Sequence, residues 1–177
     1  MWKVLLVPTV LMAQASSKGP EFAVGVGPLF FAMGGADVEV TLQPAGSRWL
    51  YGFKHVQFTD KARDPFTGRE LTETRQTLTG PTVTFVFRPG RGFSGMLGGS
   101  VLRWTKREES LMTGEVGRDS TTALFVGGGF TGTMGSHFYY RVGIYLAPGA
   151  QLKTHTSVSS EEDSGGIDAQ LHLGFRF

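Results

Sequence analysis

The sequence alternates between apolar and polar residues with a period of two along most of its 177 residues. The last segment shows this best, because the apolar residues from Ile167 to Phe177 are interleaved with Asp168, Gln170, His172, Gly174 and Arg176. Successive side chains of a β-strand point to opposite faces, whereas an amphipathic helix needs apolar residues three or four positions apart. No segment after Glu21 sustains the helical spacing, so the sequence predicts an all-β fold.

Eight alternating segments follow one another, separated by turn-forming or polar residues. In the third, the apolar positions change parity between Phe53 and Val56, which predicts a β-bulge near Lys54 and His55. The expected strands cover residues 22–30, 37–43, 49–58, 72–88, 93–105, 124–130, 138–146 and 167–177.

One face of these strands is a nearly continuous series of large apolar residues, and the other face carries charges. A soluble sandwich or barrel turns its apolar face inward, whereas a membrane barrel turns it outward to lipid. The size of the apolar face therefore favours a single up-and-down transmembrane barrel of eight antiparallel strands. Side chains just fill the interior of such a barrel, and buried charges need partners, so we expect a buried polar network and no wide pore. Its predicted members are Glu39, Arg103, Arg141, Asp168, His172 and Arg176.

The connections alternate in length, which also indicates a membrane barrel with short turns at one end and longer loops at the other. The short connections are 44–47, 89–92 and 132–136, and the long, charged ones are Asp60–Glu70, Lys106–Asp119 and Pro148–Gly165. With the short turns in the periplasm, one rim gathers Phe22, Trp49, Tyr51, Phe87, Phe93, Phe138, Tyr140, Phe175 and Phe177. The other rim gathers Phe30, Phe58 and Trp104, so two aromatic belts are expected.

The N-terminus has the features of a secretory signal peptide. Lys3 precedes a short apolar run, and Ala13-Gln14-Ala15 provides the small residues of a cleavage site. We expect residues 1–15 to be removed on export and residues 16–177 to form the barrel domain.

Composition excludes several other classes of protein. The chain has no cysteine, which excludes disulfides, thiol catalysis and a lipidated cysteine. The net charge of +2 argues against nucleic acid as a partner. No spacing of ligand residues indicates a metal site, and we expect no cofactor.

The C-terminal segment 171–177 alternates and ends in phenylalanine, and in this it resembles the terminal strand of bacterial outer-membrane proteins. With the export signal and the eight segments, the whole mature chain is similar to small outer-membrane barrels of the surface-antigen type. This resemblance implies location in the bacterial outer membrane, contact with its lipids and lipopolysaccharide, and Phe175 and Phe177 as the signal that the barrel assembly machinery reads.

A second resemblance is local. His155 and Ser157, followed by Asp168, resemble the C-terminal region of the PagL family of lipid A deacylases, although Val158 stands where that family has asparagine. The resemblance implies His155 as base, Ser157 as nucleophile and Asp168 as the acid that orients the imidazole.

Three functions follow from these observations. We favour a non-enzymatic barrel with a filled interior, whose loops serve envelope structure, adhesion or partner binding. The alternatives are transport of a small apolar molecule by a narrow or lateral path, and the lipid A esterase. Basic residues of the long loops are also placed to meet lipopolysaccharide phosphates, namely Lys61, Arg63, Arg69, Lys106, Arg107, Arg118 and Lys153.

Overall fold

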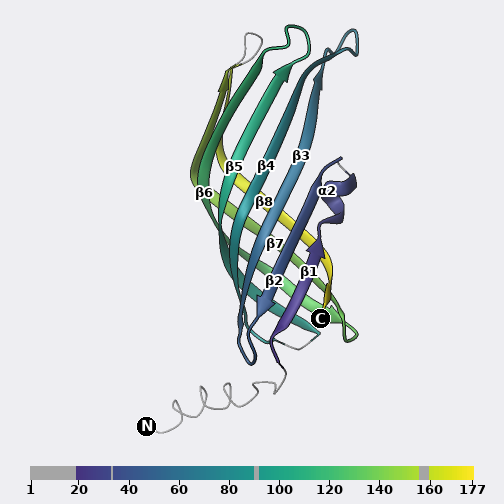
Figure 1. The fold of residues 1–177 in the computed structure, drawn as a ribbon, viewed down its shortest axis with the longest axis vertical. Helices are drawn as coiled ribbons and strands as arrows, with labels where there is room; N and C mark the ends of the chain where they lie inside the picture. Colours follow the sequence, from purple (N-terminus) through teal and green to yellow (C-terminus); the bar gives the residue numbers. More distant parts are fainter. Residues whose placement is uncertain (1–18, 33, 90–91, 156–159) are drawn as a thin grey trace.

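The computed structural model describes residues 19–32, 34–89, 92–155 and 160–177, and these form eight antiparallel strands closed into a barrel (Figure 1). The predicted signal peptide lies outside the described residues. The strands are β1 (Glu21–Val26), β2 (Ala36–Gln43), β3 (Trp49–Arg63), β4 (Glu70–Val86), β5 (Phe93–Ser110), β6 (Val116–Met134), β7 (Phe138–His155) and β8 (Ser160–Arg176). A short helix, α2 (Pro28–Ala32), connects β1 to β2, and no helix of the described chain is long and apolar enough to cross a membrane. The predicted all-β class and strand order are confirmed.

The barrel closes where β1 meets β8. Ala23 pairs with Arg176, and the backbone N–H of Phe177 donates to the carbonyl of Phe22 at 2.8 Å. On the inner side, Arg176 Nη1 lies 2.9 Å from Glu21 Oε2. Phe177 therefore belongs to the ladder that joins the first strand to the last.

A broad apolar belt faces outward around the barrel. On β8 the outward residues run from Ile167 to Phe177, which is about 33 Å of strand and, at a tilt of roughly 40°, about 25 Å of height. This height matches the apolar band of membrane barrels. At the short-turn end the belt finishes in exposed aromatic rings, as predicted, including Phe22, Trp49, Phe93 and Phe175.

Strands β3 to β8 extend well past this belt at the long-loop end (Figure 1). Much of the three segments predicted as long loops is strand, so those predictions were too long. The β3–β4 connection is only 64–69, and the β5–β6 connection is only 111–115. The physical reason is that a strand above the lipid can have polar residues on its outer face, so charge no longer marks a loop.

Above the belt the barrel wall separates into two parts. The β2–β3 ladder stops at the pair Ala36 and Gln57, and the β6–β7 ladder starts only at Val126 and Leu146. The upper parts of β3, β4, β5 and β6 (58–63, 70–79, 103–110 and 116–125) thus form a four-stranded sheet, which we call the projecting sheet. The upper β7–β8 hairpin is the second part.

The predicted bulge in β3 is absent. Lys54 and Val56 both face the interior and are buried, whereas Phe53 and His55 face outward, and pairing with β4 is continuous there. The described ladders shift register elsewhere, at Ala62/Arg63 and at Ala147/Gln151. The parity change had a different cause: Val56 is an apolar residue that packs inside the barrel.

The close approach of β6 to β7 requires glycine. A Cβ at Gly129 would overlap the carbonyl oxygen of Val142 and would lie 2.6 Å from the Cα of Gly143. We expect Gly129→Ala to destabilise the barrel by about 1–3 kcal/mol, measured by urea unfolding and heat-modifiable gel mobility. Gly92→Ala is the control, because a Cβ there meets nothing within 4 Å. Equal stability of the two variants would contradict this packing.

Candidate functional site

A network of four charged side chains crosses the barrel interior. Glu39 Oε2 accepts hydrogen bonds from Arg141 Nη1 and, at 3.1 Å, from His172 Nδ1, while Oε1 accepts from Thr82 Oγ1 at 2.9 Å. His172 Nε2 faces Asp37 Oδ2 at 2.8 Å. Both ring nitrogens of His172 thus face carboxylates, and only the imidazolium donates to both. The negative charges of Glu39 and Asp37 then balance the positive charges of Arg141 and His172.

A second set of buried side chains, Lys54, Asp168 and Gln170, also contains balanced charges. Lys54 Nζ donates to both carboxylate oxygens of Asp168, at 2.8 and 2.7 Å, and Gln170 Nε2 donates to Asp168 Oδ2 at 2.8 Å. Lys54 is fully buried and Asp168 almost so. In both groups each charged side chain has at least one partner of opposite charge.

The structure brings together four of the six residues predicted for the interior: Glu39, Arg141, Asp168 and His172. Arg176 is partly exposed at the rim, where it pairs with Glu21. Sequence reasoning missed Asp37 and Lys54. The parity of Glu39 could have indicated Asp37, but the false bulge at Lys54 and His55 hid the inward position of Lys54.

Arg103 was assigned to the wrong face. It is exposed on the outer face of β5, while its neighbours Leu102 and Trp104 are buried. Trp104 therefore belongs to no outer aromatic belt, and its Nε1 donates to Gln76 Oε1 inside the molecule. Lys106, predicted among the loop cations, also faces inward and is buried. Just above the belt, apolar residues of β5 pack inward and Arg103 faces out, which inverts the pattern below; further up, Lys106 and Glu108 are buried on the inner side.

The upper interior is an apolar core between the projecting sheet and the β7–β8 hairpin. Its buried members are Leu102, Trp104, Ala123, Phe125, Tyr145, Ala147, Ala150 and Leu152. Lower down, a cavity of about 20 Å³ beside Thr41, Tyr139 and Arg141 has room for about one water molecule. Side chains thus fill the described interior from both ends.

Asp168 does not lie where the resemblance to the PagL family would need the orienting acid. Ser157 and the side chain of His155 lie outside the described residues, but the backbone of His155 pairs with Ser160 at the far end of β8. Asp168 is eight residues further along that strand, roughly 26 Å away in extended chain. Asp168 also holds Lys54 inside the barrel, so it cannot orient His155.

Two loops at the far end of the projecting sheet share one conformation. In the β3–β4 loop, Asp64 N–H donates to the carbonyl of Arg69 at 2.8 Å, and Gly68 N–H donates to the carbonyl of Asp64 at 2.8 Å. Gly68 has a φ of 69°, a left-handed conformation that favours glycine.

The β5–β6 loop repeats this pattern. Ser110 N–H donates to the carbonyl of Glu115 at 2.9 Å, Gly114 N–H donates to the carbonyl of Ser110 at 2.8 Å, and Gly114 has a φ of 73°. The local sequences are Asp-Pro-Phe-Thr-Gly and Ser-Leu-Met-Thr-Gly. Sequence reasoning did not connect the two segments, although the shared Thr-Gly at equal distance from a capping residue was a usable signal.

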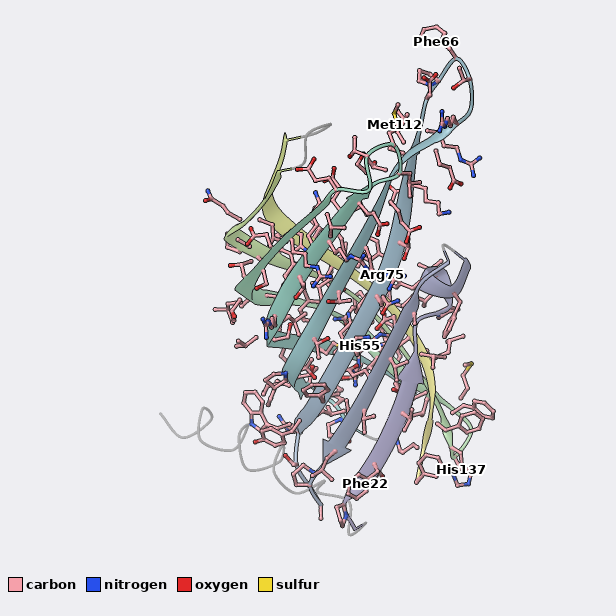
Figure 2. The ribbon with its side chains drawn as sticks, turned by 45° about the horizontal axis from the view of Figure 1, so that its top comes forward. Phe22, His55, Phe66, Arg75, Met112 and His137 are labelled. Atoms are coloured by element: carbon pink, nitrogen blue, oxygen red, sulfur yellow. The ribbon has the colours of Figure 1, made fainter. Side chains whose placement is uncertain are left out.

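Each loop presents a large apolar side chain to solvent at the third position of its local sequence, and the second loop also exposes Leu111 in part. Phe66 is 95% exposed and Met112 is 58% exposed. Figure 2 shows both at the end of the molecule opposite Phe22. We call Phe66 and Met112 the loop tips.

Side-chain hydrogen bonds hold the first loop in place. Asp64 Oδ1 accepts from the backbone N–H groups of Phe66 and Thr67 at 2.8 and 2.9 Å. These bonds from Thr67 and Phe66 lower the pKa of Asp64. Because the pKa is lowered on folding, the stabilisation is present above the usual aspartate pKa of about 3.9 and is lost only as pH falls through the lower folded value. Asp64 is therefore ionised at neutral pH and can accept both hydrogen bonds there.

No protein-family model matches this sequence, and a search of curated proteins also found no match. Solved structures are similar in fold. Neisserial surface protein A has a TM-score of 0.56 and 10% identity, covering 89% of this chain and 93% of that one. The N-terminal barrel of Pseudomonas aeruginosa OprF has a TM-score of 0.57 and 11% identity, covering 92% and 100%.

The attachment invasion locus protein Ail of Yersinia pestis, solved with the heparin analogue sucrose octasulfate, has a TM-score of 0.58 and 12% identity, covering 90% of this chain and 100% of that one. The chain has the fold of a small outer-membrane β-barrel. At these identities the likeness concerns the fold, and the function has to be argued from the residues of this chain.

The buried pair of Lys54 and Asp168 gives a stability prediction. Lys54→Met leaves the Asp168 carboxylate buried with one partner fewer, so we expect a loss of about 3–5 kcal/mol in urea unfolding from lipid vesicles. The double variant Lys54→Met/Asp168→Leu removes both charges and should recover most of that loss. A single variant as stable as the wild type would contradict the pairing.

The filled interior gives a prediction about conductance. Wild-type protein in planar bilayers should produce no stable conductance steps, because ion pairs and an apolar core fill the interior over the part of the chain that the structure describes. Steps that persist in the purified, folded protein would support the transport alternative instead. Lys54→Met, which lacks one buried ion pair, is measured in the same way for comparison.

Proposed function

We propose that this protein is a non-enzymatic surface protein of the bacterial outer membrane that binds a partner outside the cell through its loop tips. The observation that carries the proposal is a pair of loops with the same backbone hydrogen bonds, which present Phe66 and Met112 to solvent at the end of the projecting sheet. Phenylalanine and methionine are enriched at protein interfaces relative to the rest of the surface, so two such side chains exposed at the same end of the molecule suit a binding surface.

The hydrogen bonds within the loops support binding over a merely structural role. A loop that is already ordered loses little conformational entropy when it binds, so its apolar contacts contribute more to affinity. The ladder of the projecting sheet holds the two tips at fixed positions, because both loops connect neighbouring strands among β3 to β6. In the β5–β6 loop, Leu111 N–H also donates to the carbonyl of Leu71 on β4 at 2.9 Å.

The location and orientation rest on three features. The apolar belt has the height of a membrane, the C-terminal strand has the pattern of an assembly signal at Phe175 and Phe177, and the N-terminal residues 1–15 read as an export signal. Strands that extend from the long-loop end then lie outside the cell. Similar folds include a protein named for attachment and invasion and another named as a surface protein, which supports a surface role for this one.

Adhesion measurements test the proposal. The protein is produced in a non-adherent laboratory strain, and cell retention is measured on cultured epithelial cells and on plates coated with fibronectin, laminin or collagen. We expect Phe66→Ser/Met112→Ser to reduce retention at least fivefold on the surface that the wild type binds, because both apolar anchors are lost. Folding is checked by heat-modifiable gel mobility.

The matched control is Phe66→Leu/Met112→Leu, which keeps apolar tips and should retain most of the binding. Two results would overturn the proposal. In one, the wild type is retained no better than cells without it; in the other, the serine variant is retained as well as the wild type.

A further inference from the structure

Arginines gather on the outer face of the projecting sheet. On neighbouring strands Arg75 pairs with Arg107, and Arg107 pairs with Arg118, so three like charges form a row across β4, β5 and β6. Arg103 lies on the same face four residues nearer the belt. Figure 2 shows Arg75 above His55, between the short-turn end and the loop tips. We call these four residues the arginine face.

The row is unfavourable by itself. Side chains directly opposite on neighbouring strands have their Cβ atoms about 4.5–5.5 Å apart, and like charges at that spacing repel. Two carboxylates relieve part of the repulsion. Glu109 Oε2 lies 2.9 Å from Arg107 Nη2, and Glu73 Oε1 lies 3.8 Å from Arg75 Nη2. Arg103 and Arg118 make no ion pair with any described residue. The face therefore keeps a net positive charge.

Hydroxyl groups fill the space between the arginines. Thr77, Thr105 and Ser120 pair across the three strands in one row, between the row of three arginines and Arg103. Thr79 and Thr122 flank Arg103 in the next row. No described carboxylate points outward between the two levels of arginine, so an anion here would meet donors and neutral hydroxyls only.

The height of the face matches the polar layer of a membrane and the space above it. Val101 is the last apolar outward residue of β5, and Arg103 follows two residues later, about 7 Å along the strand. This places Arg103 at the level of lipid headgroups. Arg107 is about 20 Å along the strand from Val101, at the level of sugars attached to those headgroups.

We propose that the arginine face binds a saccharide that carries closely spaced phosphate or sulfate groups. Guanidinium groups bind such anions through paired hydrogen bonds, and the threonine and serine hydroxyls suit the sugar hydroxyls between them. The same chemistry has two sources: the phosphorylated lipopolysaccharide of the protein's own membrane, and a sulfated polysaccharide on another cell. The inference rests on the proposed surface location but not on the loop tips.

Binding by purified protein in detergent micelles tests this inference. One arm titrates a size-defined heparin octasaccharide, and the other uses protein in vesicles with or without phosphorylated lipopolysaccharide. We expect Arg75→Gln/Arg107→Gln/Arg118→Gln to lose at least tenfold in affinity in the arm that the wild type binds. Affinity should also fall as salt rises, because exposed charges are screened. Binding in one arm identifies the source, and binding in both establishes the shared chemistry.

The control Arg48→Gln/Arg88→Gln removes positive charge at the short-turn end, away from the arginine face, and should bind nearly as well as the wild type. The arginine-face variant should also unfold at equal or higher urea concentration, because its like charges no longer repel. Three outcomes would overturn the inference: the wild type binds neither probe, the arginine-face variant binds as well as the wild type, or the control loses as much affinity. Retention measured with the Phe66 and Met112 variants is unaffected by any of these outcomes.

Discussion

Closure of the hydrogen-bond ladder between β1 and β8 is the constraint on which the rest of this structure depends. Backbone groups in lipid have no water to bond, so a sheet in a membrane must have no open edge. The pairing of Phe22 with Phe177 and the ion pair of Glu21 with Arg176 complete the ring at its seam. Once the ring is closed, every strand must turn one face to lipid and the other to a narrow interior.

That narrow interior explains the buried charges. Eight strands leave space only for side chains, and Glu39, Arg141, Asp37 and His172 fill it as a balanced set, with Lys54 and Asp168 as a second. Such a network links strands that are far apart in the sequence.

Beyond the apolar belt the hydrogen-bond ladder no longer has to form a closed ring, and the barrel wall separates into two parts there. The ladder opens on both sides of the β3–β6 sheet, because water can satisfy the edge groups there. The exposed β3 edge carries Asp60, Lys61 and Arg63, charges that discourage edge-to-edge aggregation. This projecting sheet carries both proposed binding surfaces: the loop tips at its end and the arginine face on its outer side.

The sequence by itself determined the strand class, the number of strands, the outward apolar belt and four of the interior residues, because a period of two persists wherever lipid and a packed interior lie on opposite sides. It could not place Arg103, Trp104 or Lys54. Their orientation depends on where the belt ends and on which apolar residues pack inside, and both are set by contacts between strands far apart in the chain. The pairing of Arg75, Arg107 and Arg118 across neighbouring strands likewise arose only from strand register. Register is a property of the assembled sheet, so only the tertiary structure decided it.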